Sequence, residues 1–506
     1  MNRNKALLLL LLLLASFSLA ACSGMPKNNT CPGGNCGGNA TVSFTLVADT
    51  LPPNPSILSF KVSIVAVSLI PTSGTAQVLN PSPSIVDLMR LQSDTAFLGT
   101  LANVPSGSYT VQVTLSSPEI VFRNDTASTI TANGVACLSG FVCTATLAGV
   151  GTPTISTFTF NATAGGKQGI EIDFNLNNAI VLSGGILSVN FNPATPNPGV
   201  FTAFTLPRAN TILGTNQLEL IEDFTGVVGL NGSTVTITSR TRGVLSATVT
   251  SNSFFDQSPL PTNLCPSAPS NCAVAGQIAS VDAYLKSDGT FELKEFEPLT
   301  ATQQDSVEGT VYAVNTTTQF AIAVTDKVQA ATGSLIAGLN TGDLLTVNIP
   351  ASQPFLVDTK GLAVPPASLG LFQGKADTSA MQPGQTVAVH VTAFTAATPS
   401  IIAIATADIV ILRWSRLIAL PTGVSTATLI NVNTVPSYFV ITPASVFPTE
   451  VFSGTLGADG VTNLDGIQGS TANVNASFPV GLRVLYLQNP QLSAQFPFMA
   501  AKIRQH

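Results

Sequence analysis

The sequence predicts an all-β protein, with an N-terminal antiparallel β-sandwich followed by two or three small β-barrel repeats. Short runs alternate apolar with polar residues, which is typical of strands with one buried face. The chain contains 40 Gly and 33 Pro, and these separate the runs as turn residues do. Charged residues are only 9% of the chain, so Ser and Thr supply much of its polarity, and Thr suits the open face of a strand.

Composition also limits the number of domains and the kinds of partner. The 506 residues are too many for one hydrophobic core, so we expect roughly three or four domains. The net charge is −6, and Lys and Arg form no cluster beyond the N-terminus. Because nucleic-acid binding depends on a basic surface, the sequence excludes nucleic acid as a partner.

Residues 1–21 have the layout of a secretory signal peptide. Arg3 and Lys5 form a basic start, residues 6–15 form an apolar run, and Leu-Ala-Ala-Cys22 places small residues before a cysteine. An ordinary cleaved signal and an uncleaved membrane helix are the alternatives. The apolar run 6–21 is about one turn short of the ~20 residues that a spanning helix needs, which argues against the helix.

The Leu-Ala-Ala-Cys22 ending resembles the lipobox of bacterial lipoproteins. The resemblance implies that the thiol of Cys22 is diacylglycerated and that Cys22 becomes the new N-terminus. Ser23 follows it, where the resembling Gram-negative lipoproteins that stay in the inner membrane have Asp. We therefore expect a lipid-anchored protein of the cell envelope, in the outer membrane. Several acyl chains on one cysteine hold a protein durably at a membrane.

The other six cysteines fall into three close pairs. An even number of nearby cysteines in an exported chain predicts local disulfides, and each short loop contributes about 2 kcal/mol. A zinc site would need four ligands, and no His lies near these cysteines, so we expect no metal. The predicted disulfide pairs are Cys31/Cys36, Cys137/Cys143 and Cys265/Cys272.

Residues 22–39 are rich in Gly and Asn and predict a flexible tether. The sandwich is expected over residues 40–200, where strand patterns recur at 42–46, 59–69, 101–115, 156–160, 169–176 and 185–191. Pro105 and Gly107 mark the turn inside the 101–115 run, and residues 85–89 fit either a strand or a helical turn.

Two motifs in this region carry a resemblance. Val86-Asp87-Leu88 and the run Val-Pro-Ser-Gly-Ser-Tyr109 resemble the Val-Asp-Leu-Leu strand and Pro-Ala-Gly-x-Tyr turn of an uncharacterised domain family of bacterial envelope lipoproteins. Met89 departs from the first motif. The resemblance covers roughly residues 40–200 and implies a prealbumin-like sandwich. It assigns no catalytic residue.

The Pro-rich stretch 192–199 predicts a domain boundary. Beyond it, we expect barrel repeats at 215–300, 301–413 and 414–506. The first two open with Gly-x-Val strands at 224–229 and 307–314, and the third opens at 416 without the glycine. A Pro-Gly landmark at 383–384 parallels Pro-Val-Gly at 479–481. This order of strands is similar to a second uncharacterised family, of small OB-like barrels. A chain with one Trp and five Tyr lacks the aromatic platforms of nucleic-acid-binding OB folds.

Histidine is scarce, which limits the available catalytic chemistry. His390 and His506 are the only two, and His390 falls on the opposite strand face from the neighbouring valines, which indicates an exposed residue. Gly-x-Ser-x-Gly, His-Glu-x-x-His, phosphate-binding and dinucleotide-binding motifs are absent from the sequence. We therefore expect no catalytic residue and no cofactor.

Paired carboxylates are the remaining catalytic candidates. Glu171 and Asp173 share one strand face, and such spacing raises one pKa when the pair is partly buried. Two further acidic groups occur, and solvated strand faces are the simpler interpretation for all three. The further groups are Glu219, Glu222 and Asp223, and Glu292, Glu295 and Glu297.

Two other features have structural explanations. Asp459-Gly460 and Asn463-Leu464-Asp465-Gly466 fit hairpin turns, since the positions before Gly466 do not match a calcium loop. Trp414 lies between Arg413 and Arg416, which predicts cation–π packing at the joint between two repeats, with a sugar-stacking platform as the alternative.

Together these features predict a non-enzymatic, lipid-anchored envelope protein with a binding or structural role, whose partners are the membrane and an envelope protein or glycan. The first alternative is a glycan-directed hydrolase that uses carboxylates. The second is a transmembrane β-barrel, which the mean hydropathy of +0.40 favours. Pro-rich joints, three local disulfides and the polar Arg-Gln-His506 ending argue against it.

Overall fold

The computed structural model confirms the all-β fold class. Strands dominate, and the helical elements in the described parts of the chain are one-turn segments: α2 (Leu176–Ala179), α3 (Pro366–Leu369), η2 (Arg90–Gln92), η4 (Thr378–Ala380) and η5 (Thr471–Asn473). The structure describes residues 38–51, 56–81, 85–192, 199–239, 242–255, 263–264, 272–300, 305–330, 332–349, 353–398, 401–439, 446–455, 460–487 and 497–505.

Residues 40–206, here called the N-terminal unit, form three sheets. The first sheet has the order β14 (Phe201–Leu206), β11 (Lys167–Phe174), β1 (Ala40–Val47), β5 (Ala96–Val104). The second has the order β10 (Thr154–Ala162), β6 (Gly107–Arg123), β2 (Ser56–Pro71), β3 (Gln77–Leu79), with β4 (Ile85–Asp87) on β2 and β9 (Val142–Thr146) on β6. The third is small, with the order β12 (Ile180–Ser183), β13 (Ile186–Val189), β7 (Ile130–Ala132), β8 (Val135–Cys137).

The alternating residues of the first two sheets form one hydrophobic core. Val42, Phe44 and Leu46 of β1 are fully buried, and Phe60 and Val62 of β2 belong to the same cluster. The prediction of purely antiparallel pairing is wrong for this unit, because β1 pairs with β11 in parallel. The alternation of apolar and polar residues indicates which face of a strand is buried. It does not indicate whether the neighbouring strand runs parallel or antiparallel.

Strand β14 follows the Pro-rich stretch and still pairs with β11. The chain therefore leaves the N-terminal unit after Leu206, although most of the predicted joint at 192–199 lies outside the described residues. Of the two forms expected for the stretch 85–89, the strand is present as β4, and the helical turn η2 begins just after the stretch, at Arg90.

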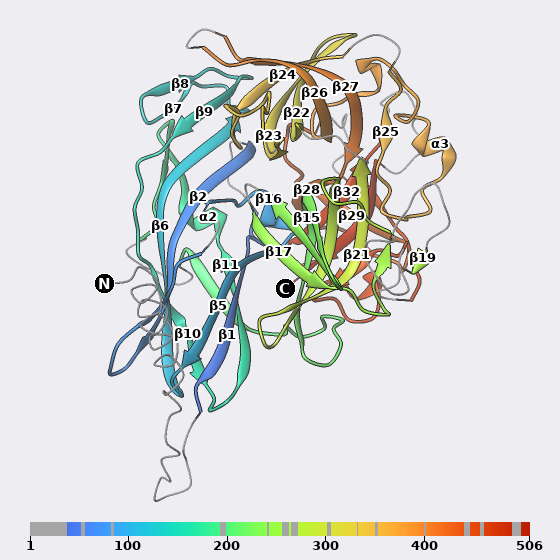
Figure 1. The fold of residues 1–506 in the computed structure, drawn as a ribbon. Coiled ribbons are helices and arrows are strands. Elements are labelled where there is room, and N and C mark those ends of the chain that lie inside the picture. The colour runs from blue at the N-terminus through green and yellow to red at the C-terminus, as the bar shows by residue number, and fades with distance from the viewer. Residues whose placement is uncertain are drawn as a thin grey trace, which may run out of the picture.

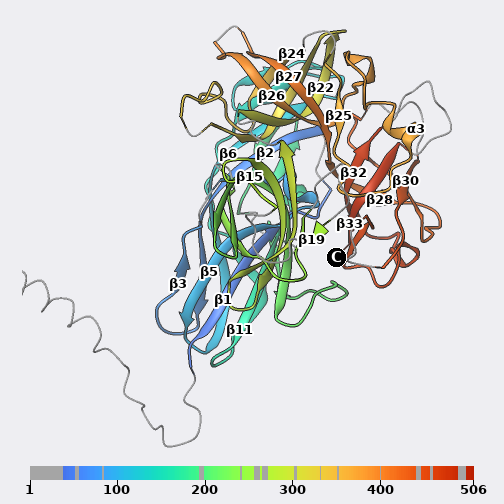
Figure 2. The same cartoon turned by 45° about the vertical axis from the view of Figure 1, so that its right-hand side comes forward.

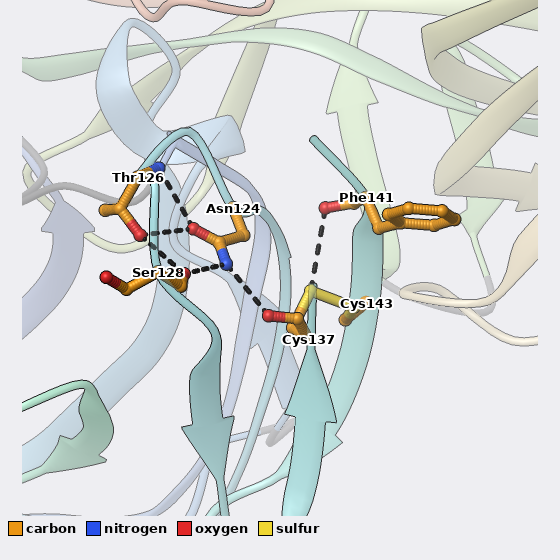
Figure 3. The surroundings of a disulfide bond; sticks show 6 residues. All are labelled: Asn124, Thr126, Ser128, Cys137, Phe141 and Cys143. Atoms are coloured by element: carbon orange, nitrogen blue, oxygen red, sulfur yellow. Dashed lines mark hydrogen bonds between the residues drawn. A yellow bond between two sulfur atoms is a disulfide. The ribbon is translucent and has the colours of Figure 1, made fainter. Parts of the chain in front are cut away.

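The predicted disulfide between Cys137 and Cys143 is confirmed, with the two Cα atoms 5.9 Å apart. It joins β8 to β9 beside Asn124, whose side-chain amide donates to the carbonyl oxygen of Cys137 at 2.8 Å (Figure 3). Cys272 is also disulfide-bonded. The other predicted disulfide cysteines, Cys31, Cys36 and Cys265, lie outside the described residues, as does Cys22.

Three repeats follow, and each has the same order of five strands. Repeat 1 contains β17 (Gly243–Thr248), β16 (Thr234–Ser239), β15 (Gln217–Asn231), β20 (Ile278–Lys286) and β21 (Phe291–Thr300), extended by β18 (Phe254–Phe255) and β19 (Asn263–Leu264). Repeat 2 contains β24 (Leu344–Asn348), β23 (Gln319–Val328), β22 (Ser306–Thr316), β26 (Thr386–Thr395) and β27 (Ala403–Arg413), with β25 (Leu356–Val357). Repeat 3 contains β30 (Phe447–Val451), β29 (Leu429–Asn433), β28 (Ser415–Pro421), β32 (Val480–Tyr486) and β33 (Phe498–Arg504), with β31 (Asn463–Asp465).

Parallel pairs join the ends of these five-strand paths, so that the sheets close on themselves as small barrels do. The closing pairs are β17–β21, β24–β27 and β30–β33. Figure 1 shows the N-terminal unit along one side of the molecule with the repeats beside it, and Figure 2 shows repeat 2 (yellow to orange) at the top and repeat 3 (red) at the right.

The opening glycine of the first two repeats has a structural cause. A Cβ on Gly226 would collide with the carbonyl oxygen of Thr238, and one on Gly309 would lie 2.6 Å from the carbonyl oxygen of Ala323. In repeat 3 the equivalent residue is Leu417, and β28 pairs with β29 only further along, at Leu420 and Pro421. Within the described residues β29 does not pair with β28 at Leu417, so the contact that requires glycine in the first two repeats is missing there.

Candidate functional site

Charged side chains from the N-terminal unit and all three repeats meet at the centre of the molecule. We call this group the ionic centre. Each side chain is at most 8% exposed, and its seven cations are about a third of the 20 Lys and Arg of the chain. The members are Arg90, Asp94, Glu222, Asp223, Asp282, Glu308, Asp326, Asp358, Lys360, Arg413, Arg416, Asp465, Arg483, Lys502 and Arg504.

Asp223 of β15 lies at the middle of the ionic centre. Its carboxylate is 2.9 Å from the Lys360 Nζ, 2.9 Å from the Arg416 guanidinium and 3.6 Å from that of Arg483. Burial disfavours the charge, but these cations hold the pKa of Asp223 well below its usual range. Asp223 is therefore ionised and serves as a common partner for repeats 2 and 3.

Glu222 reaches the same centre although it directly precedes Asp223. The β15–β20 register shifts between Ile221 and Phe224, and Asp223 has a left-handed backbone with φ of 52°. This bulge lets two consecutive side chains point the same way. Glu222 binds Lys502 and lies 2.9 Å from Arg483, and these cations lower its pKa against the effect of burial.

The N-terminal unit enters the ionic centre through η2. Arg90 lies 3.0 Å from Asp326 and 3.3 Å from Glu308, both in repeat 2. Asp94 lies 2.6 Å from Arg416 in repeat 3. The short helical turn after β4 therefore links the first unit to the second and third repeats.

Repeat 2 adds a second set of pairs. Arg413 binds Asp358 within its own repeat and lies 3.4 Å from Glu308, while Lys360 lies 3.2 Å from Asp282 of repeat 1. Removing charges from water is costly, and removing one member of such a buried pair costs about 3–5 kcal/mol. The ionic centre therefore fixes how the four units sit against one another, and each of its acids lies beside at least one cation.

A cavity of about 650 Å³ adjoins the ionic centre. Its wall comes from the N-terminal unit, repeat 1 and repeat 2 together. Four cations and two acids line it: Lys61, Arg90, Arg242 and Lys327, with Asp87 and Asp326. A second cavity of about 190 Å³ shares Phe97, Phe224 and Arg242 with the first. We treat the cavity of about 650 Å³ as the candidate binding site, because residues of three units line it.

The carboxylate pair Glu171 and Asp173 lies on β11, away from that cavity. Glu171 is buried and lies 2.6 Å from the Arg208 guanidinium. Asp173 is half-buried and accepts a hydrogen bond from the backbone NH of Asp49 at 3.1 Å. Burial, followed by the charge of Asp49, raises the pKa of Asp173 to about 7. Both carboxyl groups are thus bound within the protein.

The solvated-face interpretation of the other two acidic groups is wrong. Glu219, Glu222, Asp223, Glu295 and Glu297 are each at most 8% exposed. Of these six acids only Glu292 is partly exposed, with a side chain 19% exposed, and it pairs with Lys286 at 2.8 Å. The outer faces of the barrels pack against other units, so a charged residue that points away from its own core is still buried.

The remaining sequence candidates occupy structural positions. His390 faces away from the buried valines of β26 as predicted, but it is half-buried and lies 2.6 Å from Asp408. Residues 463–465 form β31, which pairs in parallel with β33, so the hairpin expected there is wrong. Asp465 instead binds Arg504 at 2.9 Å in the ionic centre. Asp459 and His506 lie outside the described residues.

Trp414 is fully buried in the core of repeat 2, together with Leu485 and Met499 of repeat 3. It lies at the joint between the two repeats, as predicted. Its neighbours Arg413 and Arg416 bind carboxylates. A fully buried ring offers no surface on which a sugar could stack.

Within the described residues, no group of His, Cys, Asp and Glu is arranged to hold a metal ion. None of the helices in these residues has the length and apolarity to cross a membrane. Comparison with protein-family models, curated proteins and solved structures finds no match.

Proposed function

We propose that the chain is a lipid-anchored cell-envelope protein with a non-catalytic binding role. The observation that carries the anchor is the Leu-Ala-Ala-Cys22 ending after a basic start and an apolar run. The disulfide between Cys137 and Cys143 supports an extracytoplasmic location, because disulfides persist in oxidising compartments. Ser23 favours the outer membrane by its resemblance to Gram-negative lipoproteins.

The binding role is supported by the ion pairs of the buried charged groups, which occupy the carboxylates that catalysis would need. The acids and bases of the ionic centre bind one another, and Glu171 binds Arg208, which leaves them as structural groups. The cavity of about 650 Å³ has the size of a small-molecule site and mixes charged with apolar walls. A binding protein needs such a cavity and does not need a nucleophile or a general base.

We also interpret the finer architecture along the predicted lines. The shared core of the first two sheets supports a prealbumin-like sandwich in the N-terminal unit. The five-strand order with a parallel closing pair supports OB-like barrels in the repeats. These assignments describe scaffolds, and the activity has to be argued from the site.

Intact-mass spectrometry of the protein from the cell envelope tests the anchor. We expect residues 1–21 to be removed and Cys22 to carry the mass of attached acyl chains. Cys22→Ala should abolish the added mass and release the protein from membranes, whereas Ser23→Ala should leave the acylation unchanged. An unmodified Cys22 still joined to residues 1–21 would overturn the proposal.

A further inference from the structure

We propose that the cavity of about 650 Å³ binds a small organic anion, whose carboxylate or phosphate group is bound by Lys61 and Arg242 and whose apolar group lies against Phe97 and Phe224. This inference rests on the proposed binding role and names the chemical class of the ligand. No substrate is converted in this proposal.

Arg242 is a cation in the cavity wall that keeps hydrogen-bond donors for a ligand. Arg242 donates to the backbone carbonyl oxygens of Asp223 and Glu222, and within the described residues it forms no ion pair with a carboxylate. Its guanidinium lies 4.7 Å from the centre of the Phe224 ring. A guanidinium has five N–H donors, so two carbonyl bonds leave donors for a ligand.

The electrostatic environment of Arg242 also favours the binding of an anion. Burial, followed by the nearby charge of Arg90, lowers the pKa of Arg242 to about 10. The protein thus holds this cation where its charge is incompletely compensated. A bound anion would stabilise the charged form.

Lys61 supplies a second cation, from the N-terminal unit. It lies on β2, 3.0 Å from Glu119, and donates to the carbonyl oxygen of Thr341 at 2.7 Å. The ammonium group has three donors, and these two bonds leave one. Gly342 permits this close approach, because a Cβ there would lie 2.9 Å from a Glu119 carboxylate oxygen.

The two acids in the wall are already bound by the protein. Asp326 lies 3.0 Å from Arg90. Asp87 accepts hydrogen bonds from the Ser59 hydroxyl at 2.6 Å and from the backbone NH groups of Phe60 and Met89 at 3.0 Å. Burial, the dominant effect, raises the pKa of Asp87. The charge presented by the wall is therefore positive.

The apolar part of the cavity wall indicates that the ligand also carries an apolar group. Phe97 and Phe224 line both cavities, and Leu98 and Phe291 continue the apolar surface into the smaller one. Phe97 meets Phe291 edge to face, with ring centres 5.0 Å apart. An inorganic anion would leave this surface uncovered, so we infer a ligand with an aryl or alkyl group.

Calorimetric titration of the full mature chain, held in nanodiscs of zwitterionic lipid, tests the site. The probes are phenyl phosphate and benzoate, which share the apolar group and differ in the anion. We expect one of them to bind at one site per chain, and the tighter one identifies the preferred anion. Inorganic phosphate and benzyl alcohol, which each lack one half, should bind at least tenfold more weakly, and empty nanodiscs should give no heat.

Two variants with matched controls locate the binding. Arg242→Gln and Lys61→Gln should each weaken binding about tenfold. The control for the first is Arg208→Gln, since Arg208 also stacks on a phenylalanine, at 3.6 Å from the centre of the Phe204 ring. The control for the second is Lys286→Gln, since Lys286 also pairs with a glutamate. Neither control residue lines the cavity, and both controls should bind as the unmodified chain does.

A third variant, Ala96→Trp, fills the cavity without removing an ion pair and should abolish binding while the unfolding midpoint is retained. Absence of binding by both probes overturns the site but not the lipid anchor, which mass spectrometry measures separately. Equal weakening by Arg242→Gln and Arg208→Gln also overturns the site. Release of phenol from phenyl phosphate would contradict the non-catalytic role instead.

Discussion

Repeat 1 and repeat 3 share one strand order and carry opposite charges on the faces that meet. In repeat 3, Arg416, Arg483 and Lys502 form a row across β28, β32 and β33. The equivalent row of repeat 1, across β15, β20 and β21, is Thr225, Ser280 and Glu297, with Glu222 and Asp223 beside it. The scaffold is thus repeated while the surface charge is reversed.

The equivalent face of repeat 2 carries less charge than that of repeat 1 or repeat 3. Its equivalent row is Glu308, Ala388 and Ile411, so a single acid remains. Glu308 lies 3.4 Å from Arg413 of its own repeat and 3.4 Å from Arg416 of repeat 3. Strand order alone therefore does not determine how the barrels pack, because complementary charges on otherwise similar faces select the neighbour.

The largest effect is expected from breaking the basic face. Arg483→Met leaves Glu222 and Asp223 buried with fewer cations, and should lower the free energy of unfolding by about 3–5 kcal/mol. Chemical denaturation of the full chain measures this. Arg123→Met removes a partly exposed pair with Asp125 and should cost less than about 1 kcal/mol. Equal losses in the two variants would show that the opposite charges do not hold the repeats together.

A smaller loss of stability is expected from substituting the opening glycine, and it should differ between the first two repeats and repeat 3. Gly226→Ala places a Cβ against the Thr238 carbonyl and should cost about 1–3 kcal/mol of stability. Gly309→Ala should behave alike in repeat 2. At the equivalent position of repeat 3, Leu417→Gly should destabilise the chain, because it removes a fully buried side chain and relieves no collision. A gain of stability in Leu417→Gly would contradict the proposed reason for the missing glycine.

The smallest effect is a change in the pH dependence of stability. The pKa values of Glu222 and Asp223 are depressed in the folded chain, so their contribution is present above the unfolded values near ~4 and is lost as pH falls below them. Arg483→Met removes one of the cations that lower these two pKa values. The variant should therefore lose stability less steeply between about pH 4 and pH 2, by up to about 1 kcal/mol per pH unit. Parallel profiles in pH-dependent denaturation would contradict this.

The sequence predicts the fold class better than the site. Alternation identified strands such as β1 and β26, and six-residue spacing identified the pairing of Cys137 with Cys143. The sequence does not predict the burial of Glu222 and Glu297. The alternation of apolar and polar residues shows only that a side chain points away from the core of its own barrel. Whether water or another unit covers that face depends on packing between distant segments.

Some signals in the sequence were nevertheless available. Glu222 and Asp223 are consecutive acids within a strand pattern, which implies a bulge if both have a role. Lys502 and Arg504 alternate on one face of the last strand, opposite in sign to the acids of β15. In a chain with so few charges, two such segments of opposite sign are candidates for mutual contact.

The position of Arg504 has a consequence for biosynthesis. Its guanidinium donates to the carbonyl oxygen of Asp94 at 3.1 Å across 410 positions of sequence, and to the Thr95 hydroxyl at 2.6 Å. These two partners in the first unit are satisfied only once β33 is in place. A truncated product lacking β33 would also lose the Lys502 partner of Glu222 and the Arg504 partner of Asp465, and would leave these buried carboxylates with fewer cations.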